Sequence, residues 1–254
     1  MTLQAERQLI ITSLIRANKT VSVDDLSKRF NVSFNTIRRD LDALERQGIL
    51  RRTQGGAILV EFGQFAQPFH VRKAEYSEEK AAIGRVAARL VTENDIIIID
   101  AGTTAQQVAK NLGHLQHVTI LTNSLEVAND LLVHANITVI PCGGVLRPTS
   151  RSMVGIPAEQ FFSQFHADKA FIGVGGISLE TGLTNPNIHE TAVKKKMIEA
   201  AKEVIVVADH HKFERVSLSP IAPITAVHKI VTDNKTPAVI IKNLENLGIE
   251  VIVA

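Results

Sequence analysis

The feature that most constrains the fold is a run of four isoleucines, Ile96–Ile99, which is the first of several short apolar runs. A continuous apolar run of this length is typical of a strand buried on both faces of a parallel sheet. Similar runs begin at residues 118, 137, 170, 204, 230 and 249. Helical stretches separate most of them, at 105–112, 125–133, 190–202 and 238–247. The alternation predicts an α/β domain with a mainly parallel, Rossmann-like sheet.

Residues 1–58 differ from the rest of the chain in charge. They contain 10 Lys and Arg against 6 Asp and Glu, whereas the remaining residues contain 18 against 20. A small basic module followed by a near-neutral body suggests a polyanion-binding head on a different kind of domain. We therefore predict a head over 1–58, a linker over 59–74 and a second domain over 75–254. The linker contains three phenylalanines, so we expect it to dock on the second domain or on a partner chain.

Cysteine content and hydropathy narrow the cellular setting. The single cysteine, Cys142, excludes an internal disulfide and a multi-cysteine metal cluster, and we expect a buried thiol there. No signal pattern and no apolar run long enough to cross a bilayer is visible. We therefore expect a cytoplasmic protein without a membrane partner.

Residues 33–44 predict an amphipathic helix. Ile37, Leu41 and Leu44 lie on one apolar stripe, and Ser33 can cap the helix start. The opposite face carries groups of the kind that reach bases and phosphates in a major groove. A solvated helix with a few arginines is the alternative. The candidate DNA-contacting residues on this helix are Ser33, Asn35, Thr36, Arg38 and Arg39.

A shorter helix is predicted over 24–30, with Ser22 as its cap. The turn at 31–32 joins it to the helix at 33–44, and this order predicts a helix-turn-helix. An earlier helix is predicted to bury one face and to leave Arg7 and Arg16 outside it. The residues of that face are Leu9, Ile10, Ser13, Leu14 and Ala17.

Residues 49–58 predict two short strands around a turn at Gly55 and Gly56. A hairpin directly after a helix-turn-helix is expected to form a wing. This wing would place Arg51, Arg52 and Gln54 beside the DNA backbone.

The end of the first strand of the body is a candidate phosphate cradle, because ligands of open parallel sheets bind at the carboxyl ends of strands. Asp100 and Gly102 are followed by Thr103 and Thr104 at the start of a helix. Glycine permits close approach of an anion, threonines add hydroxyl donors, and a helix N-terminus adds unpaired N–H groups. The sequence is neither a Walker loop nor the dinucleotide fingerprint. A tight turn without a ligand is the alternative.

Small or polar residues also follow the other predicted strands. Lys194 and Lys212 are the cations expected to meet an anion at this edge. Glu190 can share a helix face with Lys194, either as a plain surface pair or as a donor–acceptor pair over a sugar. A solvated helix surface is the alternative for Lys194. The small and polar strand ends are Asn123, Gly143, Gly144, Gly173, Gly176 and Asp209 to Phe213.

Two sets of motifs resemble the DeoR family of bacterial transcriptional regulators. In the head they are Arg7, then Ser33-x-x-Thr36-Ile37-Arg38-Arg39-Asp40-Leu41, then Arg51-Arg52-x-x-Gly55-Gly56-Ala57. In the body they are Asp100-x-Gly102-Thr103-Thr104, Thr122-Asn123, Gly143-Gly144, Gly173 with Gly176, and Asp209-His210-x-Lys212-Phe213. The resemblance covers essentially the whole chain. It implies a winged helix-turn-helix head and an effector domain similar in fold to ribose-5-phosphate isomerase.

For the head, the resemblance implies that Thr36, Arg38 and Arg39 lie at the operator. Asp40 either orients one of these arginines through a charge-assisted bond or is a helix-surface acid.

For the body, the resemblance implies a phosphorylated sugar or a related metabolite as effector. Gly102, Thr103 and Thr104 would hold its phosphate. Family members often have a small polar residue where His211 stands, which is a departure in this chain. Lys194 and Lys212 would assist with charge, and Asp100, Asn123, Glu190 and Asp209 would contact hydroxyls or shape the site, with Gly143, Gly144 and Gly176 nearby.

The resulting prediction is a repressor of a carbohydrate catabolic operon that binds double-stranded operator DNA. Two heads that read two half-sites require at least a dimer, so we expect a homo-oligomer, either a dimer or a tetramer. The alternative is an active sugar-phosphate isomerase with a DNA-binding head, using Asp100, Glu190 or Asp209 as a base. In this chain 173–178 replaces the acid-rich stretch expected for isomerases after the fourth strand, and we predict no catalytic residues.

We predict no cofactor and no metal site. His210 and His211 are adjacent, and neighbouring residues on an extended segment point to opposite faces. No carboxylate cluster at ligand spacing accompanies them or His189. We expect His210 to be a neutral hydrogen-bonding group.

Overall fold

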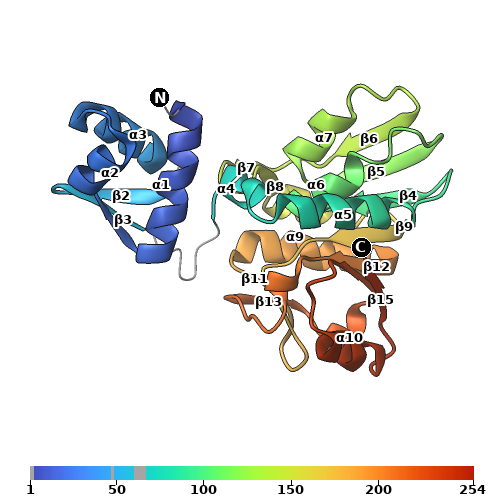
Figure 1. Ribbon diagram of the computed structural model, residues 1–254. Helices are drawn as coiled ribbons and strands as arrows, with labels where there is room; N and C mark the ends of the chain where they lie inside the picture. Colours follow the sequence, from blue (N-terminus) through green and yellow to red (C-terminus); the bar gives the residue numbers. More distant parts are fainter. Residues whose placement is uncertain (1–2, 47–48, 60–66) are drawn as a thin grey trace. The chain divides into compact units, whose positions relative to one another are not determined.

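The computed structural model describes residues 3–46, 49–59 and 67–254, and it divides into two compact units, Met1–Gly63 and Gln64–Ala254 (Figure 1). The division falls inside the linker predicted over 59–74. Within the described residues, no helix is long and apolar enough to cross a membrane.

In its described residues the first unit combines helices with a three-stranded antiparallel sheet of order β1-β3-β2. The helix-turn-helix and the wing are confirmed, as α2–α3 and β2–β3. Both predicted caps are present, because Ser22 Oγ accepts from Asp25 N at 3.0 Å and Ser33 Oγ accepts from Thr36 N at 3.2 Å. The elements are α1 (Gln4–Asn18), β1 (Thr20–Ser22), α2 (Val23–Phe30), α3 (Phe34–Arg46), β2 (Leu50–Thr53) and β3 (Gly56–Leu59).

The buried face of α1 differs from the prediction. Ile11 and Ile15 are fully buried, Leu9 is 65% exposed, and Arg7, predicted to lie outside, is only 6% exposed. The prediction was wrong because it assigned every charge to solvent. Arg7 is instead buried through a partner on α3, Asp40.

A glycine is required where the wing meets β1. A Cβ at Gly56 would lie 2.2 Å from the carbonyl oxygen of Val21, which is closer than any side chain permits. The antiparallel pairing of Val21 with Ala57 joins the wing to the start of the helix-turn-helix.

The second unit is built on a seven-stranded sheet of order β15-β14-β12-β9-β4-β5-β6, in which every neighbouring pair is parallel. This confirms the predicted parallel α/β sheet. The isoleucine run forms β4, near the centre of the sheet. The strands are β4 (Ile96–Ile99), β5 (Val118–Thr122), β6 (Ile137–Pro141), β9 (Ala167–Ile172), β12 (Ala201–Val207), β14 (Lys229–Thr232) and β15 (Glu250–Val253).

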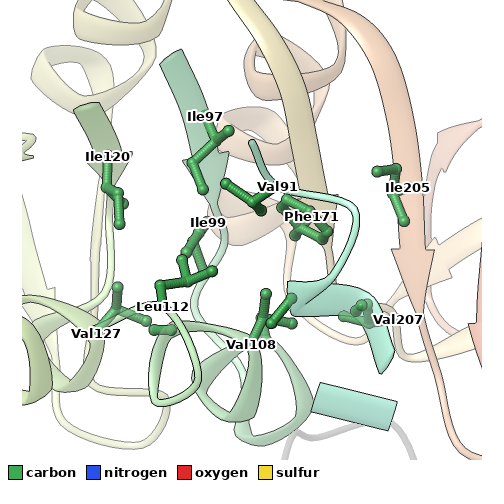
Figure 2. Packing of buried hydrophobic residues seen from close by; sticks show 14 of the residues in the cluster. Val91, Ile97, Ile99, Val108, Leu112, Ile120, Val127, Phe171, Ile205 and Val207 are labelled. Carbon is green, nitrogen blue, oxygen red and sulfur yellow. The ribbon is translucent and has the colours of Figure 1, made fainter. Parts of the chain in front are cut away.

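Both faces of this sheet are covered, as its apolar strands require. Ile97 and Ile99 point to one face, where they pack with Val108 and Phe171 under α5 and α6 (Figure 2). Ile98 points to the other face, in a cluster with residues of α8 and α9. The helices are α4 (Phe69–Ala74), α5 (Ser77–Ala88), α6 (Thr103–Ala109), α7 (Leu125–Leu131), α8 (Ile156–Phe162), α9 (Ile188–Glu199), α10 (Ala238–Glu245), and the 3-10 turns η1 (His210–Lys212) and η2 (Ile224–Ala226).

Short antiparallel strands were not predicted, because segments of three or four residues carry little periodic signal. The β7–β8 hairpin and the small sheet β10-β11-β13 extend from the second unit. They are β7 (Val145–Arg147), β8 (Ser152–Val154), β10 (Gly176–Ser178), β11 (Gly182–Asn185) and β13 (Ser219–Ala222).

Helix α4 lies within the segment predicted as a linker. Phe69 is buried, its backbone N–H donates to Thr149 O at 2.7 Å, and the guanidinium of Arg151 lies 5.4 Å from its ring centroid. The expected docking of linker phenylalanines on the second domain is therefore observed at Phe69. Phe62 and Phe65 lie outside the described residues.

Helices α5 and α6 approach each other through a glycine. A Cβ at Gly84 would lie 2.4 Å from Cβ of Gln107, so the two helices touch backbone to side chain with no room for a methyl group. Figure 1 shows α4, α5 and α6 as neighbours.

Candidate DNA-contacting face and sensor site

Helix α3 presents the predicted DNA-contacting residues on its outer face. Asn35, Arg38 and Arg39 are exposed. Among the described residues, neither arginine has a hydrogen-bond or ion-pair partner. Ser33 Oγ lies 2.9 Å from Thr36 Oγ1, so these two hydroxyls are engaged with each other at the helix start. The face thus offers two free guanidinium groups for phosphates or bases.

Asp40 fulfils neither of its predicted roles. It is almost fully buried, its Oδ2 accepts from Nε of Arg7, and its Oδ1 accepts from Nε2 of Gln8 at 3.2 Å. The carboxylate therefore ties α3 to α1 from the inner side of the helix. Its spacing within the motif gave no sign of a partner 33 residues away.

The two arginines of the wing differ. Arg51 is exposed, whereas Arg52 is half-buried and its Nη1 lies 2.5 Å from Oδ1 of Asp42. The backbone N–H of Arg52 donates to Glu45 Oε1 at 2.7 Å. The wing strand is thus fastened to α3, and Arg51 is the more available cation.

The carboxyl end of β4 carries a buried ion pair. Asp100 is 1% exposed, and its Oδ2 meets Nζ of Lys194 and accepts from Gly173 N at 3.0 Å. Nζ of Lys194 also donates to Gly173 O at 2.8 Å. Burial raises the pKa of Asp100, and the charge of Lys194 opposes this rise. Oδ1 of Asp100 is buried without a hydrogen-bond partner among the described residues.

The predicted phosphate cradle follows directly. A Cβ built at Gly102 would meet no atom within 4 Å, so open space borders this buried glycine. Thr103 and Thr104 are buried at the start of α6, and no described residue hydrogen-bonds to either hydroxyl. Asn123 supports the turn, since its Oδ1 accepts from Ala101 N at 2.9 Å.

Glu190, at the start of α9, does not form the surface pair considered from the sequence. Its Oε1 accepts from Nε of Arg147 at 3.1 Å, and its Oε2 accepts from Nδ2 of Asn185 at 3.2 Å. Burial opposes ionisation of Glu190, but the hydrogen bond from Ser150 and the charge of Lys194 bring its pKa below the usual value. Lys194 is buried rather than solvated.

The carboxyl end of β12 repeats the pattern seen at β4. Asp209 is 1% exposed, its Oδ1 accepts from His211 N at 3.2 Å, and its Oδ2 is buried without a described partner. Lys212 follows in η1, where burial lowers its pKa and the charge of Asp209 opposes this. His210 Nδ1 lies 2.9 Å from Oδ1 of Asp233.

Three predicted site glycines have different surroundings. Open space borders Gly143 as it does Gly102. Gly144 has φ +125°, and a Cβ there would lie 2.5 Å from Val154 O. A Cβ at Gly176 would lie 2.3 Å from Arg215 O. Close backbone packing thus accounts for Gly144 and Gly176 without a ligand.

Cys142 is buried, as expected, and burial raises the pKa of its thiol to about 12. Within the described part of the chain, no group of three His, Cys, Asp or Glu residues is arranged to hold a metal ion.

Three basic residues near this site were missed from the sequence: Arg72, Lys80 and Arg147. Arg72 and Lys80 flank the boundary placed at residue 74, and the segment before it was interpreted as a linker. Arg147 lies in a strand too short to predict. In the sequence, Arg72 and Lys80 lie on either side of the acidic residue Glu75, whereas no pattern marks Arg147.

Comparison with known families decides the identity. Residues 7–62 match the DeoR-like helix-turn-helix domain, and residues 75–234 match the DeoR C terminal sensor domain. The chain belongs to the DeoR family. Both matches fall within the respective structural units of this DeoR protein and agree with the resemblance seen in its motifs.

Curated DeoR relatives are similar over nearly their whole length. The HTH-type transcriptional regulator GolR of Listeria innocua is 34% identical, covering 98% of both chains. The transcriptional repressor AccR of Agrobacterium fabrum is 38% identical, covering 98% of this chain and 97% of its own. The glycerol-3-phosphate regulon repressor of Escherichia coli is 34% identical, covering 97% and 98%. These names favour the regulator over the isomerase alternative.

Among solved structures, the ribose 5-phosphate isomerase A of Methanocaldococcus jannaschii is similar, with 19% identity, a TM-score of 0.40 and coverage of 54% of each chain. A likeness of this degree concerns the fold alone.

Proposed function

We propose that this DeoR protein represses a carbohydrate catabolic operon and is controlled by a phosphorylated sugar or a related metabolite. The observation that carries the DNA-binding half is the outer face of α3, where Arg38 and Arg39 are exposed and unpaired among the described residues. Relatives named as repressors, including that of the glycerol-3-phosphate regulon, support the regulatory half.

The sensor half rests on the strand ends of the second unit. One edge of the sheet carries the two buried carboxylates, Asp100 and Asp209. Open space borders Gly102 at the same edge, next to the hydroxyls of Thr103 and Thr104, which no described residue engages. An effector that prefers one arrangement of the heads changes the DNA affinity by that preference alone. We further propose a homo-oligomer, with two heads about 34 Å apart on one face of the DNA.

Operator binding tests the first half. We expect the full-length protein to bind a DNA fragment from its own promoter region with an affinity that falls steeply with salt, by a log–log slope near −0.9 per phosphate neutralised. Fluorescence anisotropy at several salt concentrations measures this slope. Specific binding that is insensitive to salt would contradict the proposal.

Two variants test the division of labour. Arg38→Ala removes a contact on the DNA side and should weaken operator binding by ~1–3 kcal/mol while leaving the thermal shift caused by sugar phosphates intact. Thr103→Ala should do the reverse. Arg85→Gln, an exposed change on α5, is the matched control for both. Equal loss of both activities in either variant would contradict the assignment.

A further inference from the structure

Helix α4 carries a half-buried arginine with unused hydrogen-bonding capacity. Nε of Arg72 donates to Gln67 O at 3.1 Å, and no other side-chain hydrogen bond joins Arg72 to a described residue. Burial lowers the pKa of Arg72, while the negative charges of Glu190 and Asp100 oppose this shift. The guanidinium therefore lies near the carboxylates of the sensor site, but it forms no ion pair with a carboxylate of the described residues.

The backbone of α4 is fixed in this position from two sides. Lys80 is 4% exposed, and its Nζ donates to Arg72 O and to Glu75 O, both at 2.5 Å. At the other end, Phe69 N donates to Thr149 O, in the loop whose Ser150 hydrogen-bonds to Glu190. Helix α4 also packs against α6, which begins at the Gly102 turn (Figure 1).

A second unpaired cation lies on the neighbouring element. The hydroxyl of Tyr76, just after α4, lies 2.7 Å from Nε2 of His211, and the two rings stack at 3.9 Å. This contact joins the end of α4 to η1, which carries Lys212. Nζ of Lys212 has no hydrogen-bond or ion-pair partner in the described chain, and the charge of Arg72 contributes to lowering its pKa. Two half-buried cations without a counter-ion among the described residues favour binding of an anion.

The same neighbourhood holds two acceptors without donors. Oδ1 of Asp100 and Oδ2 of Asp209 are buried and have no described partner. A buried carboxylate oxygen without a hydrogen bond costs free energy that a ligand hydroxyl can recover. Unpaired cations beside unpaired acceptors match a ligand with one anionic group and several hydroxyls.

We propose that Arg72 binds the anionic group of the effector together with Lys212, while Asp100 and Asp209 accept hydrogen bonds from its hydroxyls. This inference rests on the proposed sensor function and deepens it by assigning a binding residue outside the sensor match at residues 75–234. Helix α4 is the first described element after the segment that joins the two domains. A ligand held by Arg72 therefore acts on the part of the sensor that is nearest in sequence to the head.

The test uses full-length protein and three probes: inorganic phosphate, glucose 6-phosphate and unphosphorylated glucose, in chloride of matched ionic strength. Thermal unfolding and titration calorimetry measure binding. We expect both phosphates, but not glucose alone, to stabilise the wild type. Arg72→Gln should weaken phosphate binding by about 10- to 100-fold, since it removes a charge-assisted contact. Arg72→Lys should be intermediate, because lysine keeps the charge but loses the planar fork.

Two further variants make the outcome decisive. Arg85→Gln removes an exposed arginine from α5 and should bind the probes as the wild type does. Lys212→Gln should show a loss similar to that of Arg72→Gln, and it remains informative if Arg72→Gln unfolds. Wild-type affinity in both Arg72→Gln and Lys212→Gln would overturn the assignment while leaving the sensor function standing. Failure of the wild type to bind either phosphate would overturn it as well, and intact operator binding would then show that the head's function survives.

Discussion

Among the described residues, each unit has one lysine- or arginine-carboxylate pair in which both side chains are almost fully buried, and the two pairs are completed differently. In the head, both oxygens of Asp40 are used, by Arg7 and by Gln8. In the sensor, Lys194 meets one oxygen of Asp100, and the other has no described partner. We call the Arg7–Asp40 pair closed, because both carboxylate oxygens accept a hydrogen bond. We call the Lys194–Asp100 pair open, because one carboxylate oxygen has no donor among the described residues.

The difference shows how the same chemistry serves two purposes. Removing one member of a buried pair is strongly destabilising, so a fully satisfied pair works as a cross-link between helices. A pair with a vacant acceptor costs stability until a donor arrives, and such groups gather at binding sites. Variants of the two pairs test this contrast, and the closed pair should show the largest effect.

The closed pair should dominate the stability of the head. Asp40→Ala removes the buried carboxylate that contacts the guanidinium of Arg7 and should cost ~3–5 kcal/mol of unfolding free energy. Urea denaturation of the full-length protein, followed by circular dichroism, measures it. The double variant Arg7→Met/Asp40→Leu replaces the pair with apolar side chains and should recover much of the loss. A cost below about 1 kcal/mol for Asp40→Ala would show that the pair is not a cross-link.

The open pair should differ from the closed one in its effect on ligand response. Asp100→Asn preserves shape, and Lys194 keeps its bond to Gly173 O, but the buried ammonium loses its counter-charge, so the expected cost lies at the lower end of ~3–5 kcal/mol. Operator binding without ligand should match the wild type, while the thermal shift with glucose 6-phosphate should disappear. Asp40→Asn is the matched control in the head and should leave that shift intact. Loss of the shift in both variants would remove the distinction between the pairs.

Lys80 predicts a pH dependence specific to the sensor. Burial lowers its pKa from 10.5 to about 8, so the native state binds its proton less tightly than the unfolded state does. The resulting cost is complete below pH 8 and is relieved as the pH rises towards 10.5. Relative to Lys80→Met, the wild type should therefore gain ~1–2 kcal/mol between about pH 7 and about pH 9.5. Urea midpoints across this range test it, and a constant difference between the two proteins would contradict it.

An exposed pair gives the smallest effect. Lys28 and Asp24 form an i,i+4 ion pair on α2 at 2.6 Å, with both side chains largely in water. Lys28→Ala should leave the urea midpoint unchanged within error, because solvent and salt screen such pairs. A loss comparable to that of Asp40→Ala would mean that burial does not separate structural from incidental pairs here.

The head shows what sequence periodicity can predict. The stripe of Ile37, Leu41 and Leu44 is buried as expected, since these apolar positions recur at helical spacing. The buried face of α1 was not predicted, because an arginine such as Arg7 is expected to be exposed unless a buried partner is known. That partner, Asp40, lies on another helix. A contact across 33 residues leaves no local trace in the sequence.

The sensor shows the same limit at the candidate site. The strand-end rule selected Asp100 and Asp209 as site candidates, because they follow apolar runs that are easily recognised in the sequence, and both carboxylates are buried at strand ends. Arg72 lies on a helix of six residues, which is too short to display a period. Its place beside the sheet depends on the contacts of Lys80 and Phe69, which only the folded chain brings together.

The missing side chain at Gly84 has a mechanical consequence. With no methyl group between them, α5 and α6 have no compressible layer that could absorb a displacement. Lys80 of α5 connects this rigid contact to α4, because its Nζ donates to the carbonyl oxygens of Arg72 and Glu75. A shift of a few tenths of an ångström at Thr103 would thus reach residue 69 as motion of a solid block, rather than dissipate in changes of rotamer.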